Sequence, residues 1–289
     1  MPKALTLAQE EECSPRPVAA RPLRDLNSED EGWLSEIWRF RELLYFFAWR
    51  DVKVRYKQAF FGAAWAIIQP LFTMLVFAFF FGRVAKVPSS GIPYPVFCYS
   101  ALVAWTYFAG TLGLAANSLI GNANLLTKIY FPRVLLPGGS ALSSLLDFGV
   151  GSIFLFAMMA YYHLVPPWRI VFWPLAILAM VAVTLGISML LAALNVRYRD
   201  VKHIIPFVVQ LGLFATPVIY PPNFLPPRWH YLLALNPLSS VMEIFRACLF
   251  RAYALDLRLV TISLAVGLLL LLAGGLYFRK AERTFADIV

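Results

Sequence analysis

Catalytic and metal-binding motifs are missing from this sequence of 289 residues. It has only three cysteines, Cys13, Cys98 and Cys248, and their spacing is not that of a metal site. There is no H-E-x-x-H or G-x-S-x-G segment, and no Gly-Lys pair that a P-loop would need. We therefore expect no catalytic residue, no metal and no bound cofactor in this chain, and any ATP and magnesium to bind to a partner.

Charge is also scarce, since charged residues make up 14% and hydrophobic residues 60%, with a mean hydropathy of +0.69. Soluble proteins are about half apolar and a quarter charged. The composition therefore predicts an integral membrane protein. The net charge of +9 does not indicate nucleic acid as a partner, because basic residues of membrane proteins gather on the cytoplasmic side.

We expect no cleavable signal peptide, because residues 1–32 are rich in glutamate and proline and contain no apolar core. We expect a disordered tail there, with no assigned role. Residues 33–57 follow, where apolar residues recur at three- and four-residue steps among many charges. This pattern predicts an amphipathic helix on the cytoplasmic leaflet.

Six apolar runs then predict an all-α membrane domain over residues 58–289, since a span needs about 20 apolar residues. The expected spans are residues 59–82, 95–116, 135–162, 170–194, 204–220 and 257–278. The fifth run is short and contains Pro206 and Pro217, which predicts a kink. The third contains Asp147, whose charge at a helix centre would cost roughly 2.5–3.5 kcal/mol. We expect this acid to lie off-centre, to be paired or to be protonated, in a structural role rather than as a proton carrier.

Residues 117–133 lie between two spans and are longer than a simple return loop requires. Leu125, Leu126, Ile129 and Tyr130 would share one face of a short helix, which Pro132 would end. From spacing alone, docking of another protein and attachment to lipid headgroups are equally favoured.

Residues 221–256 are broken by Pro221-Pro222, Pro226-Pro227 and Asn236-Pro237. The apolar segment among these breaks also contains Glu243 and Arg246, so it makes a poor span. We expect re-entrant helices that enter the membrane and return, which require protein or water around them.

Basic residues are distributed unequally between the two sides of these spans. Fourteen flank the N-terminal side and seven the other, which predicts that both termini are cytoplasmic. The fourteen are Arg39, Arg41, Arg50, Lys53, Arg55, Lys57, Lys128, Arg133, Arg197, Arg199, Lys202, Arg279, Lys280 and Arg283, and the seven are Arg83, Lys86, Arg169, Arg228, Arg246, Arg251 and Arg258.

Five motifs now indicate a family. These are residues 50–58 leading into 62–70, RDVKVRYKQ and GAAWAIIQP, then KIYFPR at 128–133, NVRYRDV at 195–201, TPVIY at 216–220 and NPL at 236–238. Together they resemble the permease subunit of ABC-2 type polysaccharide exporters, in the branch that exports lipid-linked O-antigen or teichoic acid. The resemblance runs in order from about Trp33 to the C-terminus.

The resemblance implies a homodimer in the bacterial inner (plasma) membrane, bound to two copies of a separate nucleotide-binding subunit. It implies an ATPase-coupling element at Leu125, Leu126, Lys128, Ile129, Tyr130, Phe131 and Arg133. It also implies a second cytoplasmic contact or gate at Arg197, Tyr198, Arg199 and Asp200, and an external re-entrant gate that includes Asn236, Pro237, Glu243 and Arg246.

The implied substrate is a polysaccharide on a polyprenyl diphosphate, carried through a hydrated path. Aromatic candidates for that path are Trp65, Phe72, Tyr99, Trp105, Tyr107 and Phe108, although packing or lipid contact explains them as well. Arg50, Lys53, Arg55 and Lys57 are candidates for the diphosphate or lipid headgroups, and positive-inside anchoring accounts for them equally. Alternatives are a permease for capsular polysaccharide or for drugs and small lipids, and, from another class, a membrane-embedded acyltransferase.

Overall fold

A computed structural model of the chain describes residues 33–57, 62–128, 130–198, 200–253 and 255–282. All regular structure within these ranges is helical, which confirms the predicted all-α class. The chain divides into two units, residues 1–39 and residues 40–289. The expected N-terminal tail lies outside the described residues.

The single helix predicted over residues 33–57 is two helices. In the first unit, α1 spans Trp33–Arg39, and in the second unit α2 spans Arg41–Tyr56. Phe40 separates them with a backbone conformation outside the helical region, at φ −96° and ψ 19°. Apolar periodicity runs through this position, so the pattern alone does not reveal the break.

Five helical segments of the second unit are long and apolar enough to cross a membrane. At about 1.5 Å per residue, 20 residues reach the roughly 30 Å of the hydrocarbon layer. They are α3 with the π-helical turn η2 (Trp65–Val84), α4 (Tyr94–Gly121), α6 (Leu135–Tyr161), η3 with α7 (Trp168–Arg197) and α11 (Leu257–Glu282). These correspond to five of the six predicted spans.

The fifth predicted span, residues 204–220, is shorter than expected. Helix α8 covers Val201–Ala215, and its 15 residues extend only about 22 Å. It ends because Pro217 favours an extended conformation at the preceding residue, Thr216, which has φ −95° and ψ 145°. Pro206 lies inside the helix, whereas Pro217 lies beyond its end.

The remaining elements are short. They are η1 (Gly62–Ala64), α5 (Ala123–Lys128), η4 (Pro222–Phe224), α9 (Pro227–Ala234) and α10 (Pro237–Leu249). Helices α9 and α10 meet at a bend of 103°, so together they form either one broken span or a re-entrant pair.

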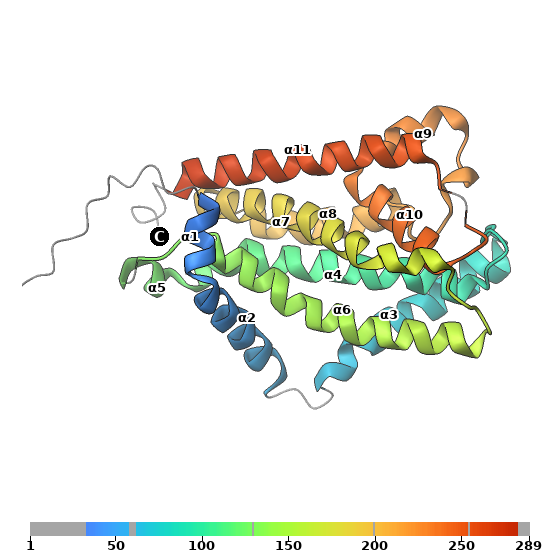
Figure 1. The fold of residues 1–289 in the computed structure, drawn as a ribbon, viewed down its shortest axis with the longest axis horizontal. Coiled ribbons are helices and arrows are strands. Elements are labelled where there is room, and N and C mark those ends of the chain that lie inside the picture. The colour runs from blue at the N-terminus through green and yellow to red at the C-terminus, as the bar shows by residue number, and fades with distance from the viewer. Residues whose placement is uncertain (1–32, 58–61, 129, 199, 254, 283–289) are drawn as a thin grey trace, which may run out of the picture. The chain divides into compact units, whose positions relative to one another are not determined.

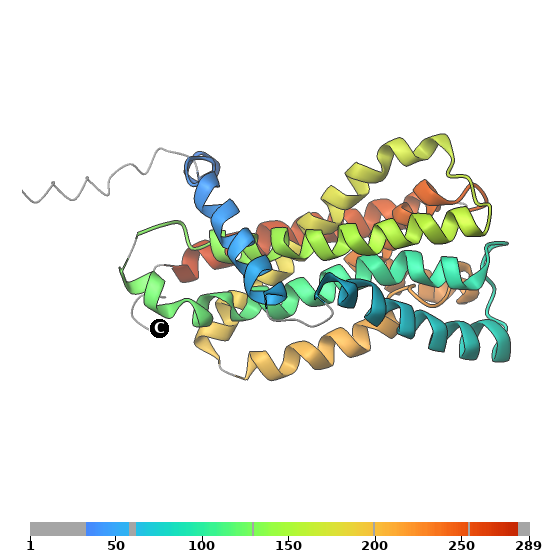
Figure 2. The ribbon, with the colours of Figure 1, turned by 90° about the horizontal axis from the view of Figure 1, so that it is seen from below.

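Helix α4 supplies much of the buried core. Its side chains pack against α3, α6, α7, α8 and α10, and almost every residue from Val96 to Phe108 is buried. Figure 1 and Figure 2 show α4 running alongside α6 and α7 within the bundle. Helix α2 packs on α6.

Helices α7 and α11 are in close backbone contact at glycines. A Cβ atom added at Gly274 would lie 2.1 Å from the carbonyl oxygen of Gly186, and one added at Gly186 would lie 2.5 Å from the Cα atom of Leu271. Small residues at helix contacts allow the backbones to approach in this way. The two helices therefore pack without intervening side chains at this point.

The helix ends gather at two opposite ends of the bundle, which Figure 1 shows by the positions of α5 and α9. We call the first the α5 end, where α4, α7 and α11 end and α6 and α8 begin. We call the second the α9 end, where α8 ends and α9, α10 and the start of α11 lie. The candidate coupling residues and the candidate gate residues fall at these two ends.

Candidate functional site

The segment after α4 is shorter than the sequence predicts. Residues 117–121 form the last turns of α4, and only residues 122–134, which we call the α5 loop, lie outside the long helices. Helix α5 ends at Lys128, so Tyr130 does not share a helical face with Leu125 and Leu126. Ile129 lies outside the described residues.

The side chains of the α5 loop divide into buried and exposed groups. Leu126 and Phe131 are buried, whereas Tyr130 is 76% exposed and Lys128 is also exposed. Leu125 is half-buried. The α5 loop therefore exposes Lys128 and Tyr130 and buries Leu126 and Phe131 against the rest of the protein.

Two neighbouring helices hold the α5 loop. The Phe131 ring lies 5.5 Å from the Phe47 ring of α2, measured between ring centroids. The Arg133 backbone N–H donates a hydrogen bond of 2.7 Å to the Glu282 carboxylate at the end of α11. The Arg133 guanidinium also donates to the Glu282 main-chain oxygen.

The end of α4 joins the α5 loop to α2 and α7. Arg50 on α2 donates a 2.7 Å hydrogen bond to the Asn122 side-chain oxygen and forms an ion pair of 2.9 Å with Asp51. Asn195 near the end of α7 donates a 2.8 Å hydrogen bond to the Ala116 carbonyl and contacts the Asn117 side chain at 3.3 Å. The motifs RDVKVRYKQ and NVRYRDV thus both contact the end of α4.

The second predicted contact segment is exposed. Arg197, Tyr198 and Asp200 all face outward, and the Arg197 guanidinium lies 5.5 Å from the centroid of the Tyr198 ring. Arg199 lies outside the described residues. The α5 end therefore carries two groups of exposed polar side chains, Lys128 with Tyr130, and Arg197 with Tyr198 and Asp200.

Asp147 of α6 is paired with α2. Its carboxylate accepts hydrogen bonds from the Arg55 guanidinium and from the Tyr56 hydroxyl. Of the three arrangements that the sequence leaves open for this acid, the structure thus shows pairing. Four basic residues of α2 and its C-cap were candidates for binding phosphate or headgroups. Arg50 and Arg55 form ion pairs with Asp51 and Asp147 and are half-buried, whereas Lys53 and Lys57 are exposed.

A cavity of about 530 Å³ lies between α2, α4 and α6. Its lining is mixed, with Val54, Leu114 and Leu136 as the large apolar side chains. The polar and charged lining residues are Arg50, Asp51, Arg55, Asn117, Ser118, Asn122 and Ser140.

At the α9 end, Asn236 connects three elements. Its side chain accepts a 3.0 Å hydrogen bond from the Leu238 backbone N–H and so caps α10, with Pro237 at the first position of the helix. The same side chain donates to the Thr216 hydroxyl at 2.8 Å. Two motifs that are far apart in the sequence, TPVIY and NPL, are therefore in contact.

Arg246 holds the segment after α8 from inside the protein. Its side chain is 0% exposed, and its two terminal nitrogens donate hydrogen bonds of 2.6 Å each to the carbonyl oxygens of Pro217 and Val218. Its guanidinium carbon lies 3.7 Å from the centroid of the Phe97 ring. The Tyr94 hydroxyl donates to the next carbonyl, that of Ile219, at 2.9 Å.

Glu243, the other charged residue of the predicted external gate, is also buried. It lines a cavity of about 140 Å³ together with Tyr253, Asp256 and residues near η4. Burial raises the pKa of the Tyr253 phenol, while the nearby Arg246 acts in the opposite direction. The four predicted gate residues thus form part of the buried framework of the α9 end.

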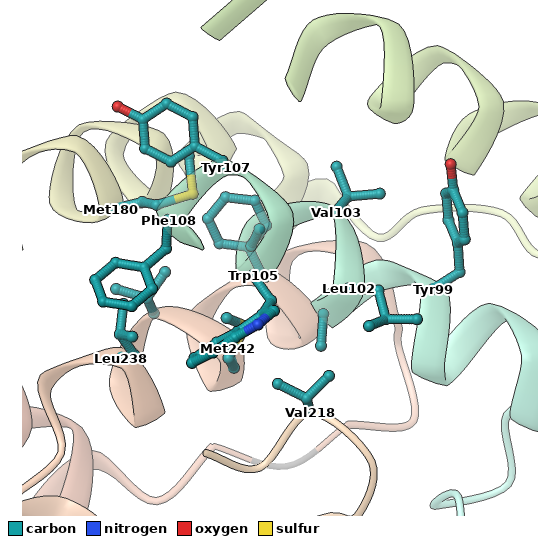
Figure 3. Packing of buried hydrophobic residues seen from close by; sticks show 14 of the residues in the cluster. Tyr99, Leu102, Val103, Trp105, Tyr107, Phe108, Met180, Val218, Leu238 and Met242 are labelled. Atoms are coloured by element: carbon teal, nitrogen blue, oxygen red, sulfur yellow. The ribbon is translucent and has the colours of Figure 1, made fainter. Parts of the chain in front are cut away.

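The six predicted aromatic residues do not share one surface. Tyr99, Trp105, Tyr107 and Phe108 are buried in the core cluster, where Figure 3 shows them among Leu102, Val218 and Met242. Trp65 and Phe72 on α3 are 54% and 64% exposed. In this structure only these two are accessible from the protein surface.

Sequence reasoning missed several residues of these two ends. Glu282 and Phe47 gave no local signal, because their partners are distant in the chain. Ser263 donates a 2.7 Å hydrogen bond to the Asn236 carbonyl and looked like an ordinary residue of an apolar span. Asn195 could have been identified from the sequence, because it is a polar residue at the end of an apolar helix.

A scan of protein families matches residues 42–250 to the ABC-2 type transporter family. The matched range covers more than half of the chain and includes both ends of the bundle. The chain belongs to the ABC-2 type transporter family and is a multi-pass membrane protein.

Curated relatives are similar over most of the chain. It is 30% identical over 257 residues to the O-antigen export system permease protein RfbA of Myxococcus xanthus, which covers 88% of this chain and 98% of the relative. It is 29% identical to the protein of the same name from Klebsiella pneumoniae, over 83% of this chain and 92% of the relative. The polysialic acid transport protein KpsM of Escherichia coli is 23% identical over 71% of this chain and 80% of the relative.

Proposed function

We propose that this chain is the transmembrane subunit of an ATP-driven exporter that moves a lipid-linked polysaccharide, of the O-antigen or teichoic-acid kind, out of the cytoplasm. The observation that carries the proposal is the similarity to O-antigen export permeases over nearly their whole length. Capsular polysaccharide is the second candidate, which the weaker similarity to a polysialic acid transport protein favours.

The ATPase is a separate subunit that binds at the α5 end, two copies for two permeases. The exposure of Lys128, Tyr130, Arg197, Tyr198 and Asp200 supports this assignment, because a protein-docking surface needs accessible polar and aromatic side chains. Leu126 and Phe131 support the surface from beneath. Arg133 acts through its contact with Glu282.

The permease is a homodimer, and the polymer passes between the two copies. Helices α3 and α8 support this proposal because they expose apolar and aromatic side chains along their lengths. Of the predicted aromatics, Trp65 and Phe72 are the ones placed to contact sugar rings, since the other four are buried in this structure. Weak, repeated stacking contacts suit a sliding polymer better than one tight site.

The carrier diphosphate meets α2 before the polymer enters the path. Lys53 and Lys57 make the direct contact, because their ammonium groups are exposed, whereas Arg50 and Arg55 already pair with Asp51 and Asp147. A compact ammonium group suits a phosphate. Helix α2 therefore lies at the membrane surface, next to the headgroups.

The α5 end faces the cytoplasm of a bacterial cell and the α9 end faces outward. The excess of basic residues at the α5 end supports this orientation, which places both termini in the cytoplasm. Helices α9 and α10 then form an external re-entrant gate whose framework includes Asn236, Pro237, Glu243 and Arg246.

Export from the native host tests this proposal. Deletion of the gene should abolish the lipid-linked polymer on the cell surface and leave it in the cytoplasm, and the gene on a plasmid should restore it. Restoration should require an ATPase subunit with an intact P-loop. Unchanged surface O-antigen together with loss of capsule would favour the second candidate, and unchanged export of both would refute the proposal.

A further inference from the structure

Glu282 binds the α5 loop by accepting two hydrogen bonds from Arg133. Its carboxylate accepts from the Arg133 backbone N–H at 2.7 Å, and its main-chain oxygen accepts from the Arg133 guanidinium. Helix α6 begins two residues later, and its N-cap residue, Val134, forms no side-chain cap. A carboxylate beside a helix N-terminus is favourable because the helix dipole is positive there. The last turn of α11 is thus attached to the loop that we assign to the ATPase.

The opposite part of the same helix binds the bend between α9 and α10. The Ser263 hydroxyl donates to the Asn236 carbonyl at 2.7 Å and accepts from the Ser240 backbone N–H at 3.2 Å. Asn236 in turn binds Thr216 in the segment after α8. One side chain of α11 therefore contacts both the N-cap and the first turn of α10, at the 103° bend.

Helix α11 is continuous between these two contacts. Ser263 and Glu282 are separated by 19 residues, or about 28 Å of unbroken α-helix. Midway, Gly274 lies so close to the Gly186 carbonyl of α7 that no side chain separates the two backbones. Because the two backbones touch directly, no flexible side chain between α7 and α11 could absorb a displacement of α11. Figure 1 shows α11 running from the α5 end to the α9 end.

We propose that Glu282 is a positioning residue that fastens the α5 loop to α11, and that α11 transmits movement of this loop to the Asn236–Ser240 bend at the α9 end. This inference rests on the proposed function, because it takes the α5 loop as the contact for the ATPase. It adds a connection that neither the family nor the sequence motifs assign. A displacement of Arg133 along the α11 axis would reach Ser263 with little loss, since the helix is unbroken and α7 supports it.

The test uses the complex of this chain with its ATPase in lipid vesicles. The variants are Glu282→Ala, which removes the carboxylate acceptor and leaves the main-chain oxygen, and Glu282→Gln, whose amide oxygen still accepts the Arg133 N–H. Lys280→Ala is the matched control, because Lys280 is an exposed residue of the same helix turn. Two quantities are measured: the polymer exported per ATP hydrolysed, and the effect of ATP on labelling of a single cysteine placed at the exposed Arg228 on α9.

Glu282→Ala should lower export per ATP roughly fivefold or more, the lower end of ordinary coupling between sites, while hydrolysis continues. ATP should no longer change the labelling rate at position 228. Glu282→Gln should recover most of the wild-type ratio, and Lys280→Ala should equal wild type. A wild-type ratio and a wild-type labelling response in Glu282→Ala would overturn the inference.

Ser263→Ala tests the contact between α11 and the bend, and it replaces Glu282→Ala as the test if that variant does not fold. It should also abolish the labelling response at position 228 while leaving ATPase binding unchanged, and an unaltered response would overturn the inference. The proposed function fails in a different way. If the wild-type complex exports no polymer, the ATP-dependent labelling at position 228 and its loss in the variants still decide whether the connection exists.

Discussion

Arg246 of α10 lies with its guanidinium carbon 3.7 Å from the centroid of the Phe97 ring of α4 and donates hydrogen bonds of 2.6 Å to the carbonyls of Pro217 and Val218. A buried cation is expensive unless it is paired or hydrogen-bonded. Here two main-chain carbonyls and an aromatic face surround it. The arginine thereby fixes the segment after α8 against α4.

Arg246→Lys should destabilise the protein, because an ammonium group cannot donate both of the hydrogen bonds that the planar guanidinium donates to two carbonyl oxygens. Hydrogen bonds to charged groups contribute about 1.5–3 kcal/mol each, so the loss of one should lower the thermal midpoint of the detergent-solubilised protein by several degrees. Arg251→Lys, at an exposed position, is the control and should melt like wild type. Equal midpoints for both variants would show that the guanidinium contacts are dispensable.

Gly274→Ala should separate α7 from α11, since the added Cβ would lie 2.1 Å from the Gly186 carbonyl oxygen. Overpacking of a close contact costs roughly 1–3 kcal/mol, and here no side chain can yield. Gly113→Ala on α4 is the matched control, because nothing lies within 4 Å of its Cβ position. Thermal unfolding of both variants in the same detergent measures the difference, and a Gly274→Ala protein as stable as Gly113→Ala would contradict the close contact.

Tyr130→Ala and Phe131→Ala should have different effects although the residues are adjacent. Tyr130 is exposed, so its loss should weaken ATPase binding and reduce coupling of hydrolysis to export while the permease remains stable. Phe131 is buried against Phe47, so its truncation should cost about 3–5 kcal/mol of stability. Pull-down of the ATPase and thermal unfolding separate the two effects, and the same phenotype in both variants would refute this division.

Asp147→Asn should lower stability but leave export intact once expression is equalised. The carboxylate accepts hydrogen bonds from Arg55 and Tyr56 and so has a structural role. In the double variant Arg55→Gln/Asp147→Asn, stability should recover relative to Asp147→Asn, because no unpaired charge remains. Loss of export from an Asp147→Asn protein of normal stability would instead indicate that the acid carries protons.

Single cysteines test the orientation. A cysteine at Lys128 should react with a membrane-impermeant reagent only in inside-out vesicles, and one at Asn223 only in intact cells. Both positions are exposed, and Lys128 ends α5 whereas Asn223 lies in η4, just before α9. The described native cysteines, Cys98 and Cys248, are buried and should react slowly. The reverse pattern would invert the proposed topology.

The sequence predicts the long helices well, because an apolar run of about 20 residues has one favourable structure in a bilayer. It predicts a break at Asn236-Pro237 but not that a helix begins there, although a capping side chain followed by a proline suits the first helical turn. The break at Phe40 was missed because an aromatic residue continues the apolar pattern through it. The segment around α5 is shorter than predicted, because α4 continues to Gly121. The apolar composition ends near Asn117, so the sequence does not show this continuation.

The contacts of the candidate site required the structure. Arg246, Glu243 and Asn236 were identified as unusual residues in an apolar segment, but their partners come from other helices. Arg55 and Asp147 are 92 residues apart, and Arg133 and Glu282 are 149 apart. No local pattern encodes such pairs, because they depend on how the helices pack.

The close fit of α11 against α7 also affects how the protein is made. Among the described helices, α11 leaves the ribosome after all the others. Before α11 inserts, Gly186 of α7 lacks its backbone contact with Gly274, and the Asn236 carbonyl lacks the Ser263 hydroxyl. These contacts therefore form late in synthesis, and a nascent chain halted before residue 257 would remain an assembly intermediate.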